Sequence, residues 1–117
     1  MMNEAAAMQM KNALSDMTAH CKARELQLAA AGRTDESIHA RIARNVYEAF
    51  TAVFDAACRQ ADPEAFFRAR LTQIPANWVA SRDTALAHGD EEKAYIESIK
   101  LKAASEVEEA FRRTTEG

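Results

Sequence analysis

The sequence predicts an all-α fold, a small bundle of four to five helices that occupies residues 1–117 as a single domain. Apolar residues recur at spacings of three and four along most of the chain, as they do on the buried face of a helix. Only three glycines and two prolines are present, and most of them fall where helices are expected to begin or end. A chain of 117 residues has the length of one domain.

The core available to this bundle is thin. Alanine contributes 26 residues, whereas leucine, isoleucine, valine and phenylalanine together contribute only 20. Such a low content of large apolar residues is typical of disordered chains, but the small net charge of −3 and the helical spacing predict that this chain folds. Thin cores are often completed by a second subunit. We therefore expect dimerisation to complete the bundle, through a homodimer or a complex with another protein.

The first helix is expected over residues 4–31, because Gly32 is suited to the left-handed turn that ends a helix. An apolar series with alternating spacings of four and three follows this segment, through Met10, Leu14, Met17, Cys21 and Leu28. Arg24 breaks the series. The first 30 residues contain no aromatic and no β-branched apolar residue, so this helix would dock weakly on its own chain. We expect it to dock on a partner, and residues 34–114 to form the main core.

The second helix begins near Thr34 or Asp35, either of which can cap free N–H groups, and it carries the strongest periodic signal. Its apolar residues form one continuous stripe, namely Ile38, Ile42, Val46, Ala49, Phe50, Val53 and Ala57. The spacing predicts that this stripe is the centre of the core.

Two shorter helices and one long helix are expected after it. Asp62-Pro63 is a typical helix start, with the acid as cap and the proline in the first turn. Pro75 disfavours helical geometry at the residue before it, which predicts a break between a third helix and a fourth over about 75–87. After Gly89, a fifth helix is expected to reach about residue 114, with a buried face of Ile96, Ile99, Ala103, Val107 and Phe111.

Composition and motifs argue against most kinds of enzyme. The isolated glycines form no phosphate-binding loop, and no serine lies in a nucleophile-elbow pattern. Cys21 and Cys58 have no metal-binding spacing, so we expect free thiols and no cofactor. The chain starts without a secretory signal pattern and has no stretch long enough to span a bilayer, so we expect a cytoplasmic protein with no membrane association.

Three kinds of site are conceivable from the residues. Glu36 and His39 have the Glu-x-x-His spacing of di-iron bundles, but a single pair is no metal site unless a dimer brings two pairs together. Arginines near the start of the second helix could contact phosphates, namely Arg33, Arg41 and Arg44, although the near-neutral charge makes nucleic acid an unfavoured partner. The candidates for contact with a protein are the apolar residues Met10, Leu14, Met17, Phe67 and Trp78.

The function predicted from the sequence is a non-enzymatic protein-interaction or scaffold module that acts as a homodimer. The alternative is a small helical DNA-binding regulator, and the third interpretation is a metal-dependent enzyme with a site shared across a dimer.

Overall fold

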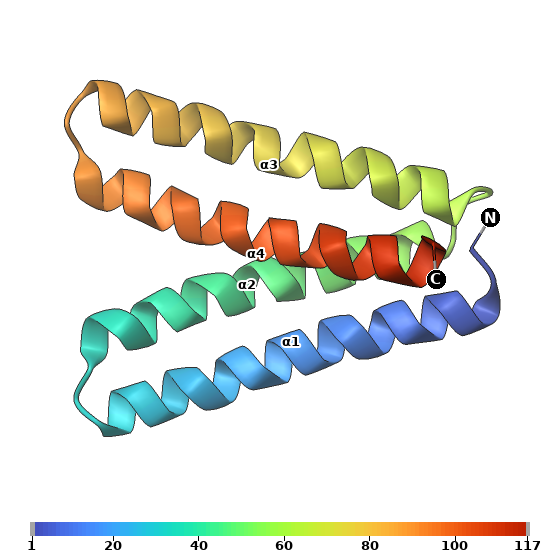
Figure 1. The fold of residues 1–117 in the computed structure, drawn as a ribbon, viewed down its shortest axis with the longest axis horizontal. Coiled ribbons are helices and arrows are strands. Elements are labelled where there is room, and N and C mark those ends of the chain that lie inside the picture. The colour runs from blue at the N-terminus through green and yellow to red at the C-terminus, as the bar shows by residue number, and fades with distance from the viewer. Residues whose placement is uncertain (1, 117) are drawn as a thin grey trace.

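The computed structural model describes residues 2–116, and these form four helices and no strand. The helices are α1 (Glu4–Ala30), α2 (Thr34–Ala57), α3 (Pro63–Ala87) and α4 (Glu91–Glu116). The prediction of a small all-α bundle is therefore confirmed. Two antiparallel hairpins build it, α1 with α2 and α3 with α4, and they meet where α2 packs against α4 (Figure 1). Within the described residues α1 and α3 are not neighbours, since no Cα atoms of the two helices lie within 8 Å of each other.

Local signals in the sequence fix most helix ends. Asn3 accepts a hydrogen bond from the Ala6 amide at 2.8 Å, and Asp62 accepts one from the Ala65 amide at 3.1 Å. Both side chains thereby satisfy amides that a first helical turn leaves without a partner. Gly32 and Gly89 have φ values of 75° and 73°, a backbone conformation that is strained for residues with a side chain. Gly32 follows the end of α1 and Gly89 follows the end of α3.

The predicted helix break at Pro75 is wrong, because α3 continues through this residue. Pro75 removes one backbone donor from the helix interior, an unfavourable local term. Tertiary packing on both sides of Pro75 outweighs that term. Phe67 contacts Phe111 of α4 at a ring-centroid distance of 4.9 Å, and Ala85 is buried near the other end of α3.

The buried face of α2 is also rotated relative to the predicted stripe. Ile38 is 42% exposed, and Ile42 and Val53 are only half-buried. Tyr47 and Phe54, which lie outside the stripe, are buried together with Val46, Phe50 and Ala57. The reason is that α2 touches all three other helices, so its buried arc is centred between α1 and α4. On α4 the prediction holds for Ala103, Val107 and Phe111, whereas Ile96 and Ile99 are half-buried.

The core is concentrated at one end of the molecule. Every large side chain that is fully buried among the described residues lies in the half formed by residues 4–17, 46–75 and 103–116, which we call the closed half. These side chains are Met10, Leu14, Phe50, Phe54, Phe67, Val107 and Phe111. Phe67 is their centre, with edge-to-face contacts to three other phenylalanines.

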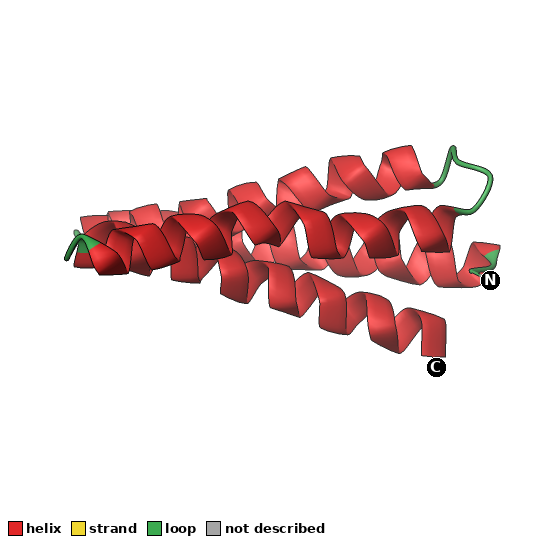
Figure 2. Ribbon diagram, turned by 90° about the horizontal axis from the view of Figure 1, so that it is seen from above, coloured by secondary structure: helices red, strands yellow, loops and turns green. Residues whose placement is uncertain are grey.

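The other half, residues 18–45 and 76–102, is called the open half. Its buried positions are mostly small or polar, such as Ala40, Ala85, Ala94 and Ser37, and Leu28 is the one large apolar side chain buried there in the described chain. The hairpins diverge toward this end (Figure 1), and from above the helices lie at nearly one level there but separate into layers toward the termini (Figure 2). The large apolar side chains are thus concentrated in the closed half, and the core is thin in the open half.

Candidate functional site

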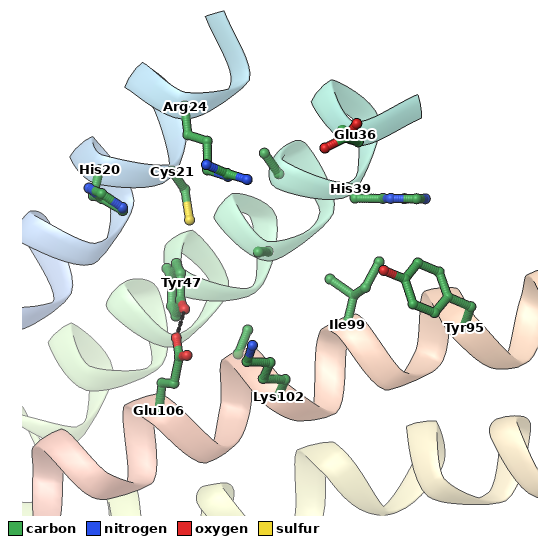
Figure 3. Close-up of a pocket in the computed structure, with 13 residues that line it drawn as sticks. His20, Cys21, Arg24, Glu36, His39, Tyr47, Tyr95, Ile99, Lys102 and Glu106 are labelled. Carbon is green, nitrogen blue, oxygen red and sulfur yellow. Dashed lines mark hydrogen bonds between the residues drawn. The ribbon is translucent and has the colours of Figure 1, made fainter. Parts of the chain in front are cut away.

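A cleft of about 460 Å³ lies between α1, α2 and α4, mostly in the open half, and reaches the edge of the closed half at one end. Its floor is made of small side chains, Ala40 and Ala43 of α2 and Ala103 of α4. Because alanines fill little space and the hairpins diverge, a space is left open above the floor, although Ala40 and Ala103 themselves are buried. Longer polar side chains form its walls and ends (Figure 3). The volume is in the range typical of small-molecule sites, about 300–1,000 Å³.

The inner end of the cleft is closed by Tyr47 and Glu106. The buried Tyr47 hydroxyl donates a hydrogen bond to the Glu106 carboxylate of α4 (Figure 3). Burial, reinforced by this hydrogen bond, raises the pKa of Tyr47 above its usual range. Burial, followed by the negative charge of Glu106, also raises the pKa of the neighbouring Cys21 thiol. A raised pKa favours the protonated thiol, which is a poorer nucleophile than the thiolate.

His39 and Tyr95 close the outer end. Their rings meet edge to face, with centroids 5.0 Å apart and planes at 72°. His39 comes from the second turn of α2 and Tyr95 from the second turn of α4, so the contact bridges the two hairpins (Figure 3). The outer end therefore offers aromatic edges, whereas the inner end offers a carboxylate that already accepts a hydrogen bond.

Two cations extend into the cleft from opposite walls, Arg24 of α1 and Lys102 of α4 (Figure 3). Neither forms an ion pair with any residue that the structure describes. The sequence contains a signal for one of them, because Arg24 occupies the position where the apolar series of the first helix is broken. Lys102 has no such signal, since a lysine on α4 resembles its exposed neighbours.

The predicted metal pair, Glu36 and His39, does lie at the cleft. Arg33 holds Glu36 through both of its carboxylate oxygens, with one hydrogen bond of 2.8 Å, and this contact lowers the pKa of Glu36. No group of three or more His, Cys, Asp or Glu residues in the described chain is arranged to hold a metal ion. Within one chain, the carboxylate is thus engaged by an arginine rather than free to act as a ligand.

The arginines predicted to contact nucleic acid are all engaged with acidic side chains. Arg33 pairs with Glu36. Arg41 and Arg44 both reach Glu25 of α1, at 3.2 and 3.0 Å, and the hydrogen bond from Arg44, assisted by Arg41, lowers the pKa of Glu25. The contacts with Glu25 join α1 to α2. All these pairs offset the positive charge that binding to a phosphate backbone would require.

The residues predicted to contact a protein partner lie mostly inside this chain. Met10, Leu14 and Phe67 are fully buried, and Met17 and Trp78 are half-buried against the same core. A partner could reach the first three only if helices separated. The exposed apolar residues are others. Among residues 2–116 six large ones are exposed, and five of these lie in the open half, namely Leu26, Ile38, Val79, Leu86 and Tyr95.

Comparison with protein-family models, with curated proteins and with solved structures finds no match for this chain. A search of the four helices for a membrane-spanning segment finds none that combines sufficient length with sufficient hydrophobicity.

Proposed function

We propose that this protein is a non-enzymatic protein-interaction module that acts as a homodimer, with the open half as the contact surface. The observation that carries the proposal is the uneven core. All fully buried large side chains of the described chain lie in the closed half, and five of six exposed large apolar side chains lie in the open half. Exposed apolar side chains favour association because burying them removes them from water.

Charge supports a second copy of the same chain as the partner. In the open half, residues 18–45 carry five basic and three acidic side chains, whereas residues 76–102 carry four basic and five acidic ones. The two hairpins therefore have opposite net charge at this end. A twofold dimer that sets the α1–α2 hairpin of one copy on the α3–α4 hairpin of the other brings opposite charges together twice.

The other two interpretations stay predictions from the sequence. Pairing of Arg33, Arg41 and Arg44 with acidic residues gives a DNA-binding regulator little support. A metal shared between two Glu36–His39 pairs would first require Glu36 to leave Arg33. The interaction module requires neither rearrangement.

The test is the molecular mass in solution, measured by light scattering or sedimentation over a range of protein concentrations. Leu86 and Met8 are a matched pair, because both are 58% exposed but lie in opposite halves. Leu86→Lys or Ile38→Lys should raise the dimer dissociation constant at least about tenfold, which corresponds to about 1.4 kcal/mol. Met8→Lys should leave it unchanged. A monomer at every concentration, or equal effects of the three substitutions, would refute the dimer.

A further inference from the structure

We propose that the cleft between α1, α2 and α4 binds a small organic anion, a carboxylate or a phosphate ester that carries a flat apolar group. All residues that line the cleft come from one chain, so the cleft forms without a second copy, although Tyr95 also belongs to the contact surface proposed for the dimer. Four features of the cleft lead to it: the engaged acids, the two available cations, the small floor residues and the aromatic outer end.

The unused hydrogen-bonding capacity of the walls consists mainly of donors. Arg24 has five N–H groups and Lys102 has three, and neither cation is paired with an acid among residues 2–116. The two acids of the cleft already have donors, since Glu36 binds Arg33 and Glu106 binds Tyr47. A ligand that complements such walls must supply acceptors and negative charge.

The position of the anionic group follows from the ends of the cleft. Glu106 would repel an anion at the inner end, where Tyr47 holds its carboxylate in place. Arg24 and Lys102 lie between that end and the aromatic pair (Figure 3). The anionic group is therefore expected between the two cations. A planar carboxylate or a phosphate suits the fork of N–H groups that a guanidinium presents.

The rest of the ligand is expected to be flat and apolar. Ala40, Ala43 and Ala103 form a floor without large or charged side chains, and it continues to Ile99. Beyond it, the rings of His39 and Tyr95 present aromatic edges. A ring that lies on the alanines and meets these edges would gain apolar burial and edge-to-face contact. Phenyl phosphate and benzoate have this combination of groups and serve as probes.

The experiment is a titration of the full-length protein with phenyl phosphate and with benzoate, followed by NMR at constant ionic strength. Inorganic phosphate tests the contribution of the ring, and benzylamine, a cation of similar shape, tests the sign of the charge. We expect saturable binding of at least one aromatic anion, with shifts at Arg24, Ala40 and Tyr95. Inorganic phosphate should bind more weakly, and benzylamine should not saturate.

Matched variants separate this site from a general attraction of anions. Arg24→Gln and Lys102→Gln should each weaken binding of the aromatic anion at least about tenfold, as expected when one partner of a charged contact is removed. Lys22→Gln and Arg113→Gln, which remove exposed charges outside the cleft, should have no effect. The inference is refuted if neither aromatic anion saturates, if benzylamine binds as well as they do, or if all four variants weaken binding equally. Circular dichroism of each variant confirms that the helices persist.

Discussion

The Tyr47 hydroxyl donates a hydrogen bond to the Glu106 carboxylate and so joins α2 to α4 where the closed half meets the open half. On one side of this contact the interior is filled by phenylalanines, and on the other side it contains the floor of the cleft. The two residues are far apart in the sequence, so the contact exists only when both hairpins have docked. Substitutions at this contact therefore test both the stability of the fold and the integrity of the cleft.

Tyr47→Phe should lower the free energy of unfolding by about 0.5–1.5 kcal/mol, because it removes one hydrogen bond and leaves no buried acceptor unpaired. Glu106 is exposed, so water can hydrate its carboxylate in the variant. Urea denaturation at neutral pH measures the change. Tyr95→Phe is the control, because its exposed hydroxyl has no hydrogen-bond partner among the described residues. An equal loss in both variants would contradict a stabilising role for the contact.

The same variant should change how stability depends on alkaline pH. The folded state raises the pKa of Tyr47, so it holds the phenolic proton more tightly than the unfolded chain does. The resulting stabilisation is fully present below the unfolded pKa of about 10 and is lost as the pH rises through the folded value. Denaturation curves from pH 8 to pH 11 should show a loss above about pH 10 that Tyr47→Phe reduces. Parallel profiles for the two proteins would contradict this.

Pro75→Ala should stabilise the protein by about 1–3 kcal/mol, because alanine restores a donor inside α3 and is the better helix former. Pro63→Ala is the matched control, since Pro63 occupies the first turn of α3, where a missing donor has little cost. Thermal or urea denaturation of both variants gives the comparison. If Pro75 instead began a separate helix, its replacement would be neutral or destabilising, as at Pro63.

Most helix ends could be predicted from the sequence because the residues that determine them are local. The predicted cap of the second helix is wrong, since Arg33 is the N-cap residue of α2 and no side chain caps that end. Asp62 caps α3, and Gly32 and Gly89 end the first helix of each hairpin, as their types and positions indicate. Pro75 could not be judged in this way, because packing of α3 against α4 decides its conformation. The buried face of α2 was misplaced for a similar reason. Periodicity defines a stripe on a helix but not which neighbours cover it, so Ile38 is exposed and Phe54 is buried.

The cleft was less accessible to sequence reasoning than the fold. Tyr47 with Glu106, and His39 with Tyr95, are pairs that only docking of the hairpins brings together, and neither has a local motif. Arg24 is the exception, because it interrupts an apolar series. A charge at such a position indicates that the helix is not covered there, and the structure places Arg24 in the wall of the cleft.

Glu97→Leu should stabilise the protein by about 1–2 kcal/mol, because it removes a buried carboxylate oxygen that has no partner among the described residues, while the partly exposed Lys100 can be hydrated after losing its acid. Glu97 is only 6% exposed, on the face of α4 that also buries Ala94 and Ala104. Lys100 pairs with its Oε1 at 3.1 Å, but Oε2 is buried without a partner among the described residues. Glu92→Leu, at an exposed position of the same helix, should change stability by less than about 0.5 kcal/mol. A fall in stability of Glu97→Leu would show that unseen contacts compensate the buried charge.

Hydrogen exchange should reveal two levels of protection along each of α2 and α4. Backbone amides exchange through local opening wherever few apolar contacts resist it, and the open half has small buried side chains. We therefore expect residues 35–42 and 92–99 to exchange faster than residues 50–57 and 104–111 of the same helices. Mass spectrometry of peptides from these four segments measures the difference, and uniform protection along both helices would contradict it.

The concentration dependence of this exchange links the uneven core to the proposed dimer. A second copy that covers the open half stabilises it in proportion to the fraction of chains that are paired. Protection of residues 35–42 and 92–99 should therefore increase with protein concentration. Amides of the closed half should exchange only through global unfolding of the chain. In Leu86→Lys the open half should stay weakly protected at every concentration, whereas Met8→Lys should behave like the unmodified protein. Protection that is independent of concentration in all three proteins would show that the open half is exposed in a monomer.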